Sequence, residues 1–243
     1  SLIYTSGTTG MPKGVVVGHR GLAPFAATQT RRFGVDHTSR TLHFASPGFD
    51  AAMLELLLAV DAAATMTIAP PTLYGGDELT EFLAEQRVTH AFVTPAALSA
   101  AGPRDLPDLR CLGVGGESFG RDLVARWGAD RTLLNCYGPT ETTIVALMSS
   151  LHPGEPITIG RPVAGVSAMV LDHRLRPLPP FAPGELYLTG PGLATGYLNR
   201  SSQTARTFVA ATDGSGARMY RTGDLAATDL AGNLVFHGRS DHQ

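Results

Sequence analysis

The sequence predicts an α/β fold, with a mostly parallel sheet flanked by helices and then a smaller β-rich, distorted barrel-like subdomain. Two observations support this division. Up to about residue 150, short apolar runs alternate with helical patterns, which is typical of a parallel sheet covered by helices. From about residue 153, short strand-like runs are separated by Pro and Gly clusters. The predicted domains are therefore residues 1–152 and 153–236, followed by the segment 237–243.

The elements of the first domain follow from its apolar runs. The predicted strands are 65–69 (TMTIA), 90–94 (HAFVT), 109–115 (LRCLGVG) and 132–137 (TLLNCY). Residues 77–87 and 120–127 are predicted helices, and Asp77 or Thr80 is a candidate N-cap for the first of them. Because ligands of parallel sheets gather beyond the carboxyl ends of the strands, we expect a binding site in the loops that follow them.

The second domain has fewer helical signals. Its predicted strands are 167–172 (SAMVLD), 184–190 (GELYLTG) and 233–238 (NLVFHG), and helical periodicity is confined to 201–208.

Composition excludes several classes of protein. The chain has 243 residues with a formal net charge of -2, which argues against nucleic acid or an anionic membrane as a partner. Cys111 and Cys136 lie in apolar runs, so buried thiols are expected rather than a disulfide. There is no metal-ligand spacing and no leader, and the longest apolar stretch is too short to cross a bilayer. We therefore expect a cytoplasmic protein.

The stretch 4–14 (YTSGTTGMPKG) combines hydroxyl residues, glycines and one cation. A Walker-type P-loop leads directly into a helix, but Pro12 and Gly14 on either side of Lys13 disfavour a helix start. A surface turn is an alternative, although it does not explain the lysine next to a proline. We favour a flexible phosphate loop, in which backbone N–H groups and hydroxyls surround phosphate oxygens and Lys13 neutralises their charge.

This stretch resembles the phosphate loop of the adenylate-forming superfamily, which includes acyl-CoA synthetases, luciferases and adenylation domains of nonribosomal peptide synthetases. Further blocks resemble those of the family in the same order: 49–55 (FDAAMLE) the acyl-substrate pocket, 135–143 (NCYGPTETT) the nucleotide and magnesium motif, 184–199 a structural block, 220–225 (YRTGDL) the ribose-binding block, and 238–243 (GRSDHQ) the hinge. The resemblance spans the whole chain and is stronger to peptide-synthetase adenylation domains than to acyl-CoA synthetases.

The resemblance implies an activity, its cofactors and its partners. An amino acid is activated with ATP and Mg²⁺ as an aminoacyl adenylate, pyrophosphate is released, and the product is loaded onto the phosphopantetheine thiol of a carrier domain that works beside a condensation domain. Family members also carry residues before the phosphate loop and a mobile C-terminal lid with a lysine that assists adenylation. We therefore expect that this chain alone makes no appreciable adenylate.

The resemblance also implies roles for individual residues. The phosphates would be held by Thr5, Ser6, Gly7, Thr8, Thr9, Gly10 and Lys13, and the catalytic residues would be Thr8, Lys13 and Glu141. The adenine would lie against Gly115, Gly116, Glu117, Asn135 and Tyr137. Gly138 would form the turn that presents Thr140 beside Glu141, where a hydroxyl next to a carboxylate suits Mg²⁺. Glu141 would hold Mg²⁺, Asp224 would bind the ribose, and Arg239 would contact the ribose or a phosphate. From the residues alone, Tyr137 can also be a core residue, and Glu141 and Asp224 can be turn residues.

Asp50 is implied to pair with the α-ammonium of the substrate, an aspartate that synthetases of aryl acids lack. Its alternative role is the N-cap of a helix that begins near Ala51. The predicted side-chain pocket consists of Ala51, Leu54, Phe92, Leu112, Val114, Cys136, Ile144 and Val145. None of these is charged, so a hydrophobic amino acid is expected, with a branched aliphatic side chain favoured. The alternative functions are an acyl- or aryl-CoA synthetase core and a non-catalytic nucleotide-binding module.

Overall fold

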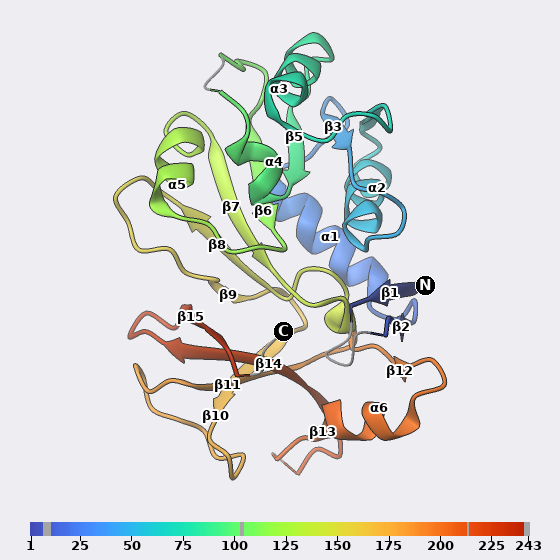
Figure 1. Ribbon diagram of the computed structural model, residues 1–243, viewed down its shortest axis with the longest axis vertical. Helices are drawn as coiled ribbons and strands as arrows, with labels where there is room; N and C mark the ends of the chain where they lie inside the picture. The colour runs from blue at the N-terminus through green and yellow to red at the C-terminus, as the bar shows by residue number, and fades with distance from the viewer. Residues whose placement is uncertain (7–10, 103–104, 213, 241–243) are drawn as a thin grey trace. The chain divides into compact units, whose positions relative to one another are not determined.

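The computed structural model describes residues 1–6, 11–102, 105–212 and 214–240, which form two compact units (Figure 1). Unit 1 comprises Ser1–Phe25, Tyr137–Met148 and Thr158–Gln243, and unit 2 comprises Ala26–Cys136 and Ser149–Ile157. The predicted boundary at residue 152 lies in the segment Ser149–Ile157, shortly before the chain returns to unit 1 at Thr158. However, the first 25 residues belong with the β-rich part, because their strand β2 (Lys13–Val16) pairs with the later strand β12 (Gly196–Tyr197).

Unit 2 is built on parallel strands that run in the order β4-β3-β5-β6-β7. The strands are β3 (Arg40–His43), β4 (Thr65–Ile68), β5 (His90–Val93), β6 (Cys111–Gly115) and β7 (Thr132–Tyr137). The helices are α2 (Ala51–Asp61), α3 (Gly76–Glu85), α4 (Pro95–Ser99) and α5 (Arg121–Trp127), together with most of α1 (Leu22–Phe33). The predicted parallel sheet, its four predicted strands and both predicted helices are confirmed.

The predicted N-cap of α3 is wrong. Gly75 occupies the cap position, with a φ of 141° that suits only glycine. The carboxylate of Asp77 instead accepts a hydrogen bond from the backbone N–H of Gly102 at 2.8 Å. Asp77 thus bonds a segment that is distant in sequence and does not cap the N-terminus of α3.

The two faces of this sheet carry different neighbours. Residues paired in register on parallel strands share a face, and alternate residues point to opposite faces. Leu112 of β6 packs in one buried cluster with Leu98 of α4 and Leu123 of α5. On the other face the ring of Phe33 of α1 covers Gly113, where an added Cβ would lie 2.6 Å from its Cζ. Figure 1 accordingly shows α4 and α5 in front of these strands and α1 behind them.

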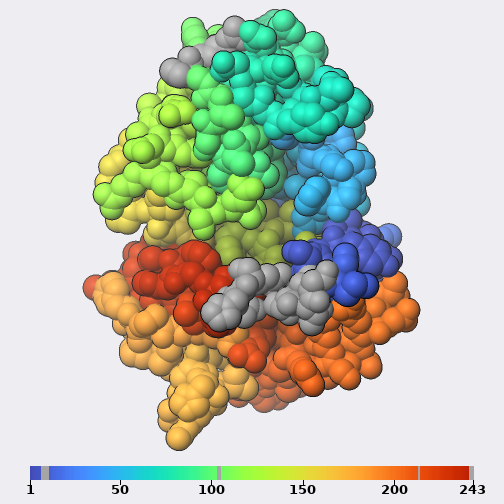
Figure 2. All heavy atoms as spheres, viewed as in Figure 1, coloured from blue at the N-terminus to red at the C-terminus, as the bar shows by residue number. Residues whose placement is uncertain are grey.

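Unit 1 contains antiparallel strands. One sheet has the order β10-β11-β14-β13 with β15 also paired to β14, a second has the order β1-β2-β12, and β8 pairs with β9. The elements are β1 (Leu2–Thr5), β2 (Lys13–Val16), the 3₁₀ helix η1 (Thr140–Thr142), β9 (Arg161–Pro162), β10 (Ser167–Leu171), β11 (Gly184–Thr189), β12 (Gly196–Tyr197), α6 (Ser201–Thr207), β13 (Phe208–Ala210), β14 (Arg218–Thr228) and β15 (Leu234–Arg239). Only the first two residues of β8 (Leu147–Leu151) belong to this unit, and the other three belong to unit 2. The predicted strands 167–172, 184–190 and 233–238 and the helix near 201–208 are confirmed. In Figure 2 the N-terminal segment (dark blue) lies against the segment around α6 (orange).

Both cysteines are free and buried, as predicted. Burial raises the pKa of the Cys111 thiol to about 12, so this group stays protonated at neutral pH. None of the described helices is long and apolar enough to cross a membrane.

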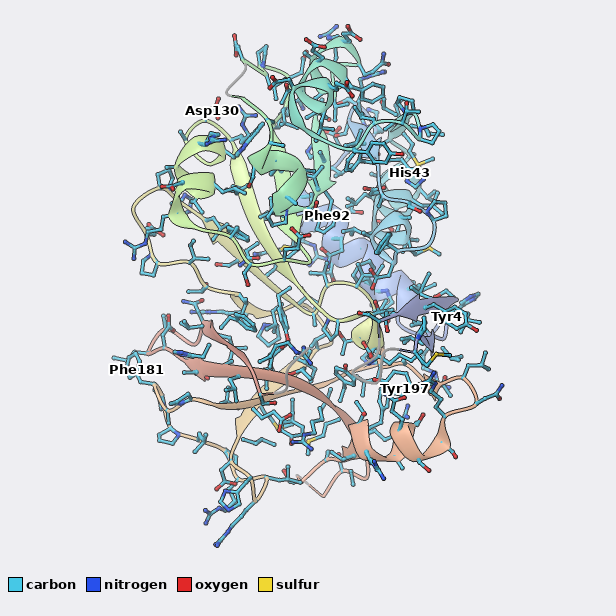
Figure 3. The ribbon with its side chains drawn as sticks, in the orientation of Figure 1. Tyr4, His43, Phe92, Asp130, Phe181 and Tyr197 are labelled. Carbon is cyan, nitrogen blue, oxygen red and sulfur yellow. The ribbon has the colours of Figure 1, made fainter. Side chains whose placement is uncertain are left out.

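Glu55 of α2 anchors the loop between β3 and α2, which leads to Asp50. Its carboxylate accepts hydrogen bonds from the backbone N–H groups of Phe44 (2.9 Å) and Ala45 (3.0 and 3.1 Å). Nδ1 of His43, labelled in Figure 3, lies 2.9 Å from Oε2 of the same carboxylate. Burial raises the pKa of Glu55 to about 8, although the two backbone donors act to lower it.

This raised pKa predicts a dependence of stability on pH. The pKa of Glu55 is higher in the folded chain than in the unfolded chain, so its neutral form favours the folded state. This contribution to stability is complete below pH 4.5 and is lost as the pH rises through about 8. One pKa unit corresponds to about 1.4 kcal/mol, so the loss amounts to several kcal/mol. Glu55→Gln keeps an acceptor for the loop without an ionisable proton. We expect urea unfolding at pH 9 to find the variant more stable than the parent, with the difference shrinking toward pH 5. A pH-independent difference would contradict this account.

Candidate active site

Lys13, Glu141 and Tyr197 form one hydrogen-bonded cluster in unit 1. Nζ of Lys13 donates to Oε1 of Glu141 at 2.9 Å, and the hydroxyl of Tyr197 donates to the same oxygen at 2.7 Å. Nζ also donates to the Tyr197 hydroxyl at 3.2 Å and lies 4.6 Å from the centre of its ring. Lys13 is only 9% exposed and Glu141 only 4%. The ammonium and the carboxylate therefore neutralise each other in a largely buried place.

The backbone explains how these side chains meet. Tyr197 of β12 pairs with Val15 of β2, and Lys13 lies two residues before Val15 and so points to the same face. The segment that carries Glu141 is held by a hydrogen bond from the N–H of Ala194 to the carbonyl of Glu141 at 2.8 Å. Tyr197 is labelled in Figure 3. Three segments distant in sequence thus supply one cluster.

Glycine is required in the turn before Glu141. A Cβ at Gly138 would lie 2.3 Å from the carbonyl oxygen of Ile144, closer than any side chain tolerates. After the 3₁₀ helix, Thr143 and Ile144 adopt φ values of 64° and 69°. This compact turn buries Glu141, so the alternative of an exposed turn carboxylate does not apply.

Two buried tyrosines surround Glu141. Burial and then the nearby charge of Glu141 raise the pKa of Tyr197, and the same two causes raise the pKa of Tyr220. Both hydroxyls therefore remain protonated at physiological pH. They can donate hydrogen bonds to a carboxylate or to an anionic ligand in its place.

A second cluster centres on Asp224 of β14, which is 7% exposed. The hydroxyl of Tyr137 donates to Oδ2, and Nη1 of Arg239 donates to Oδ1 at 2.9 Å. Arg239 lies directly opposite Asp224 in the pairing of β14 with β15. The backbone N–H of Asp224 donates to Oγ1 of Thr222 at 3.0 Å. Three residues that the sequence assigned to adenine and ribose thus lie together within unit 1.

A cavity of about 320 Å³ opens in unit 1 next to both clusters. Among the described residues its lining includes the cations Lys13, Arg206, Arg221 and Arg239 and the carboxylate Glu185. Lys13, Arg221 and Arg239 are each paired with a carboxylate, that of Glu141, Glu185 and Asp224 respectively. Four cations along one cavity suit a polyanionic ligand that takes over some of these contacts.

The remaining phosphate-loop residues are only partly described. Gly7, Thr8, Thr9 and Gly10 lie outside the described residues. Thr5 ends β1 and pairs with Lys13 across the β1–β2 ladder, and Ser6 follows it as an exposed residue. The half-buried Thr140 begins the 3₁₀ helix that carries Glu141.

The residues predicted to surround the adenine from unit 2 lie at the ends of β6 and β7. Gly115 is buried, whereas Gly116 and Glu117 are exposed. Oε2 of Glu117 accepts a hydrogen bond from the backbone N–H of Ala96 at 3.2 Å. Asn135 is buried two residues before the end of β7 and pairs in register with Val114.

The predicted side-chain pocket is brought together only in part. Phe92 pairs in register with Gly113, and Cys136 pairs with Gly115, so these residues share one face of the sheet. Leu112 and Val114 point to the opposite face, where both belong to the buried cluster beneath the helices α4 and α5. They do not lie beside Phe92. The period-two alternation along β6 is the sequence signal that favours Gly113 and Gly115 instead.

The other pocket residues belong to separate elements. Asp50 immediately precedes α2, but its side chain makes no capping hydrogen bond. Ala51 is half-buried and Leu54 is fully buried on the same helix. Ile144 and Val145 are buried in unit 1.

Tyr197 is the functional candidate that the sequence did not identify, and it yields a stability prediction. Tyr197→Phe removes a hydroxyl that contacts both members of a buried ion pair, which we expect to cost about 1–3 kcal/mol in urea unfolding. Tyr187→Phe is the matched control, because that hydroxyl makes one 3.3 Å contact to Glu185. The control should cost less than about 0.5 kcal/mol. Equal losses in the two variants would show that the Tyr197 hydroxyl does not hold the pair.

Comparison with known proteins identifies the family. The family model described as AMP-binding enzyme matches residues 1–198. Novobiocin biosynthesis protein H of Streptomyces niveus is 49% identical to this chain over 246 residues, which cover 100% of the chain and 41% of that protein. Phosphinothricin tripeptide synthetase PhsC of Streptomyces viridochromogenes is 43% identical over 245 residues, covering 100% of the chain and 22% of that protein.

A solved structure gives the same result. The holo form of PA1221, a nonribosomal peptide synthetase protein with adenylation and PCP domains, superposes with a TM-score of 0.90 at 30% identity, covering 100% of this chain and 44% of that one. The chain spans less than half the length of each of these three proteins. The sequence match, the shared fold and the ordered blocks agree: the chain belongs to the AMP-binding enzymes, as an adenylation-domain sequence of the nonribosomal peptide synthetase type.

Proposed function

We propose that this chain binds ATP as part of a protein that activates an amino acid as its aminoacyl adenylate, with release of pyrophosphate. The observation that carries the proposal is the joint placement, in unit 1, of a cationic cavity at Lys13 and a carboxylate cluster at Asp224. The first suits a polyphosphate and the second suits the two hydroxyls of a ribose. Membership of the AMP-binding enzymes supports the same assignment.

The chemistry needs positioning and charge neutralisation more than covalent help from the protein. A carboxylate oxygen of the amino acid attacks the α-phosphorus of ATP, the bond to the bridging oxygen breaks, and pyrophosphate leaves with that oxygen. Lys13 neutralises the charge that moves onto the leaving group, assisted by the hydroxyls of Thr5 and Ser6. Asp224, held by Arg239, accepts hydrogen bonds from the ribose. We propose the same phosphate-binding role for Gly7, Thr8, Thr9 and Gly10.

The remaining nucleotide contacts follow the sequence prediction. The ring of Tyr137 would face the adenine while its hydroxyl stays on Asp224. Gly115, Gly116, Glu117 and Asn135 would complete the adenine site, with Gly138 and Thr140 shaping the turn beside it.

The residues at Glu141 fit a magnesium ion that is shared with phosphate. Mg²⁺ is bound in such sites by one or two carboxylates together with substrate phosphates and water. Among the described residues no three side chains could hold a metal without such help. Glu141 supplies one carboxylate, and its partner Lys13 would turn from that carboxylate to a phosphate when the ligand arrives. When bound, the ion would neutralise phosphate charge, while Tyr197 and Tyr220 keep Glu141 in place.

Asp50 is the residue proposed to choose an amino acid over other acids, by pairing with its α-ammonium. The side chain of the amino-acid substrate would lie against the sheet face that carries Phe92 and Cys136. This surface favours a substrate with a largely apolar side chain. We also propose that the adenylate is passed to the phosphopantetheine thiol of a carrier domain, with a condensation domain beside it. PA1221, which contains adenylation and PCP domains, supports this partner.

Isotope exchange between pyrophosphate and ATP tests the proposal in the complete protein that carries this chain. We expect exchange with at least one amino acid and none with fatty or aryl acids, and Asp50→Asn should abolish the preference for the α-amino group. Exchange with aryl or fatty acids alone would identify an acyl- or aryl-CoA synthetase. Binding of ATP by calorimetry without exchange for any acid would identify a non-catalytic nucleotide-binding module.

A further inference from the structure

Gln29 of α1 is a buried polar side chain without a partner in the described part of the chain. The residue is 0% exposed, and neither Oε1 nor Nε2 of its amide has a hydrogen-bond partner there. A primary amide has two donor and two acceptor positions, and leaving them unpaired in the interior carries a free-energy cost. Such exceptions in a folded protein call for an explanation. One explanation is a bound ligand that forms hydrogen bonds with both Oε1 and Nε2 of the amide.

The face of α1 that carries Gln29 lies on the sheet of unit 2. Gln29 precedes Phe33 by four residues, so both side chains lie on the same face of the helix. The ring of Phe33 covers Gly113 of β6. Gln29 therefore points toward the face of the sheet that carries Gly113. This is the face on which α1 lies, behind the sheet in Figure 1.

The level of Gln29 along the strands follows from the direction of the helix. The ring of His90, the first residue of β5, hydrogen-bonds the backbone of Gly34, just after the end of α1. The helix therefore ends where the strands begin. Going back from Phe33 to Gln29 moves about 6 Å toward the carboxyl ends of the strands, or about two strand residues. This places Gln29 near the level of Gly115 and Cys136.

The face of the sheet toward which Gln29 points carries Phe92 and Cys136 near this level. Phe92 presents its ring, with Cε2 only 3.3 Å from the position of a Cβ added at Gly115. Sγ of Cys136 already points toward the carbonyl of Leu134, at 3.9 Å. Phe92 and Cys136 are also the two residues that the proposed function assigns to the substrate side chain. The amide thus lies at the end of the sheet where that side chain would enter.

We propose that the amide of Gln29 is the polar end of the substrate side-chain pocket and selects an amino acid whose largely apolar side chain carries one hydrogen-bonding group, such as a hydroxyl. This inference rests on the proposed function and narrows its substrate class. A purely aliphatic side chain would leave both ends of the amide unpaired, whereas a hydroxyl can donate to Oε1 or accept from Nε2. Gln29 is therefore a specificity-determining residue.

Pairs of amino acids that differ in one hydroxyl test the proposal. Pyrophosphate exchange by the complete protein is measured with tyrosine and phenylalanine, and with threonine and the isosteric valine. We expect the hydroxylated member of one pair to have a kcat/KM at least about a hundredfold higher, because a site built to bond a hydroxyl rejects the analogue that lacks it. Gln29→Leu should reduce this ratio to less than about tenfold. Arg31→Leu, at an exposed position of the same helix, should leave it unchanged.

Thermal unfolding without amino acid supplies a second readout. Gln29→Leu removes two unpaired groups, so the variant should unfold at the same Tm as the parent or higher. The hydroxylated substrate should raise the Tm of the parent more than that of the variant. A lower Tm for the free variant would show that the amide has a partner inside the protein and would overturn the proposal.

The remaining outcomes separate this inference from the proposed function. A purely apolar amino acid as the best substrate, with the same ratio in Gln29→Leu, would overturn the role of Gln29 and leave amino-acid activation intact. Exchange with no amino acid at all would overturn the proposed function and this inference with it.

Discussion

Lys13→Ala in the complete protein is expected to lower the kcat of amino-acid-dependent pyrophosphate exchange by about 10²–10³-fold, with little change in the KM of the amino acid. Removing one group that stabilises developing charge has an effect of about this size. Lys13 is the only lysine in the sequence, and its Nζ already lies in the cationic cavity, held by Glu141 and Tyr197. No other lysine of this chain can replace it.

Two variants make the test specific. Lys13→Arg keeps the charge and should recover part of the rate, although a planar guanidinium matches the geometry of an ammonium poorly. Arg176→Ala removes an exposed cation that is paired with Asp172, and it should leave kcat unchanged. A loss confined to the KM of the amino acid would place Lys13 outside the chemical step.

Glu141→Gln is expected to raise the Mg²⁺ concentration needed for half-maximal exchange by about tenfold or more. An amide oxygen is a weaker ligand for a hard cation than a carboxylate. Because Lys13 turns from Glu141 to a phosphate when the nucleotide is bound, kcat at saturating Mg²⁺ should change less than the Mg²⁺ requirement. Titration of exchange with MgCl₂ measures both quantities. Glu155→Gln, at an exposed position, serves as the control, and an unchanged Mg²⁺ requirement in Glu141→Gln would remove Glu141 from the metal site.

The elements were predictable because their signals are local. The run 132–137 predicts β7 to the residue, and the weak helical pattern near 201–208 predicts α6. The N-cap of α3 was not predictable, because the carboxylate of Asp77 accepts a hydrogen bond from the backbone N–H of Gly102, which is distant in sequence. The pairing of β2 with β12 was also not predictable, because it joins segments about 180 residues apart. That pairing places the first 25 residues in unit 1.

The candidate site was predicted in part for the same reason. Tyr137, Asp224 and Arg239 were identified from their blocks, but the blocks do not show that the pairing of β14 with β15 sets Arg239 opposite Asp224. Tyr197 was assigned to a structural block, and only the fold reveals its contact with Lys13. On β6 the apolar Leu112 and Val114 were selected for their chemistry, whereas the alternation of the strand directs them to the opposite face. Residue type alone does not specify which face a side chain occupies.

A structure of the complete protein with a non-hydrolysable ATP analogue and Mg²⁺ tests the central claim most directly. The account predicts that the phosphates occupy the cavity at Lys13, that Nζ leaves Glu141 for a phosphate oxygen, and that the ribose hydroxyls lie on Asp224. The pair of Lys13 and Glu141 would then be replaced by two separate contacts with the ligand and its ion. A nucleotide bound elsewhere, with Lys13 still on Glu141 and Asp224 contacting only Tyr137 and Arg239, would contradict it.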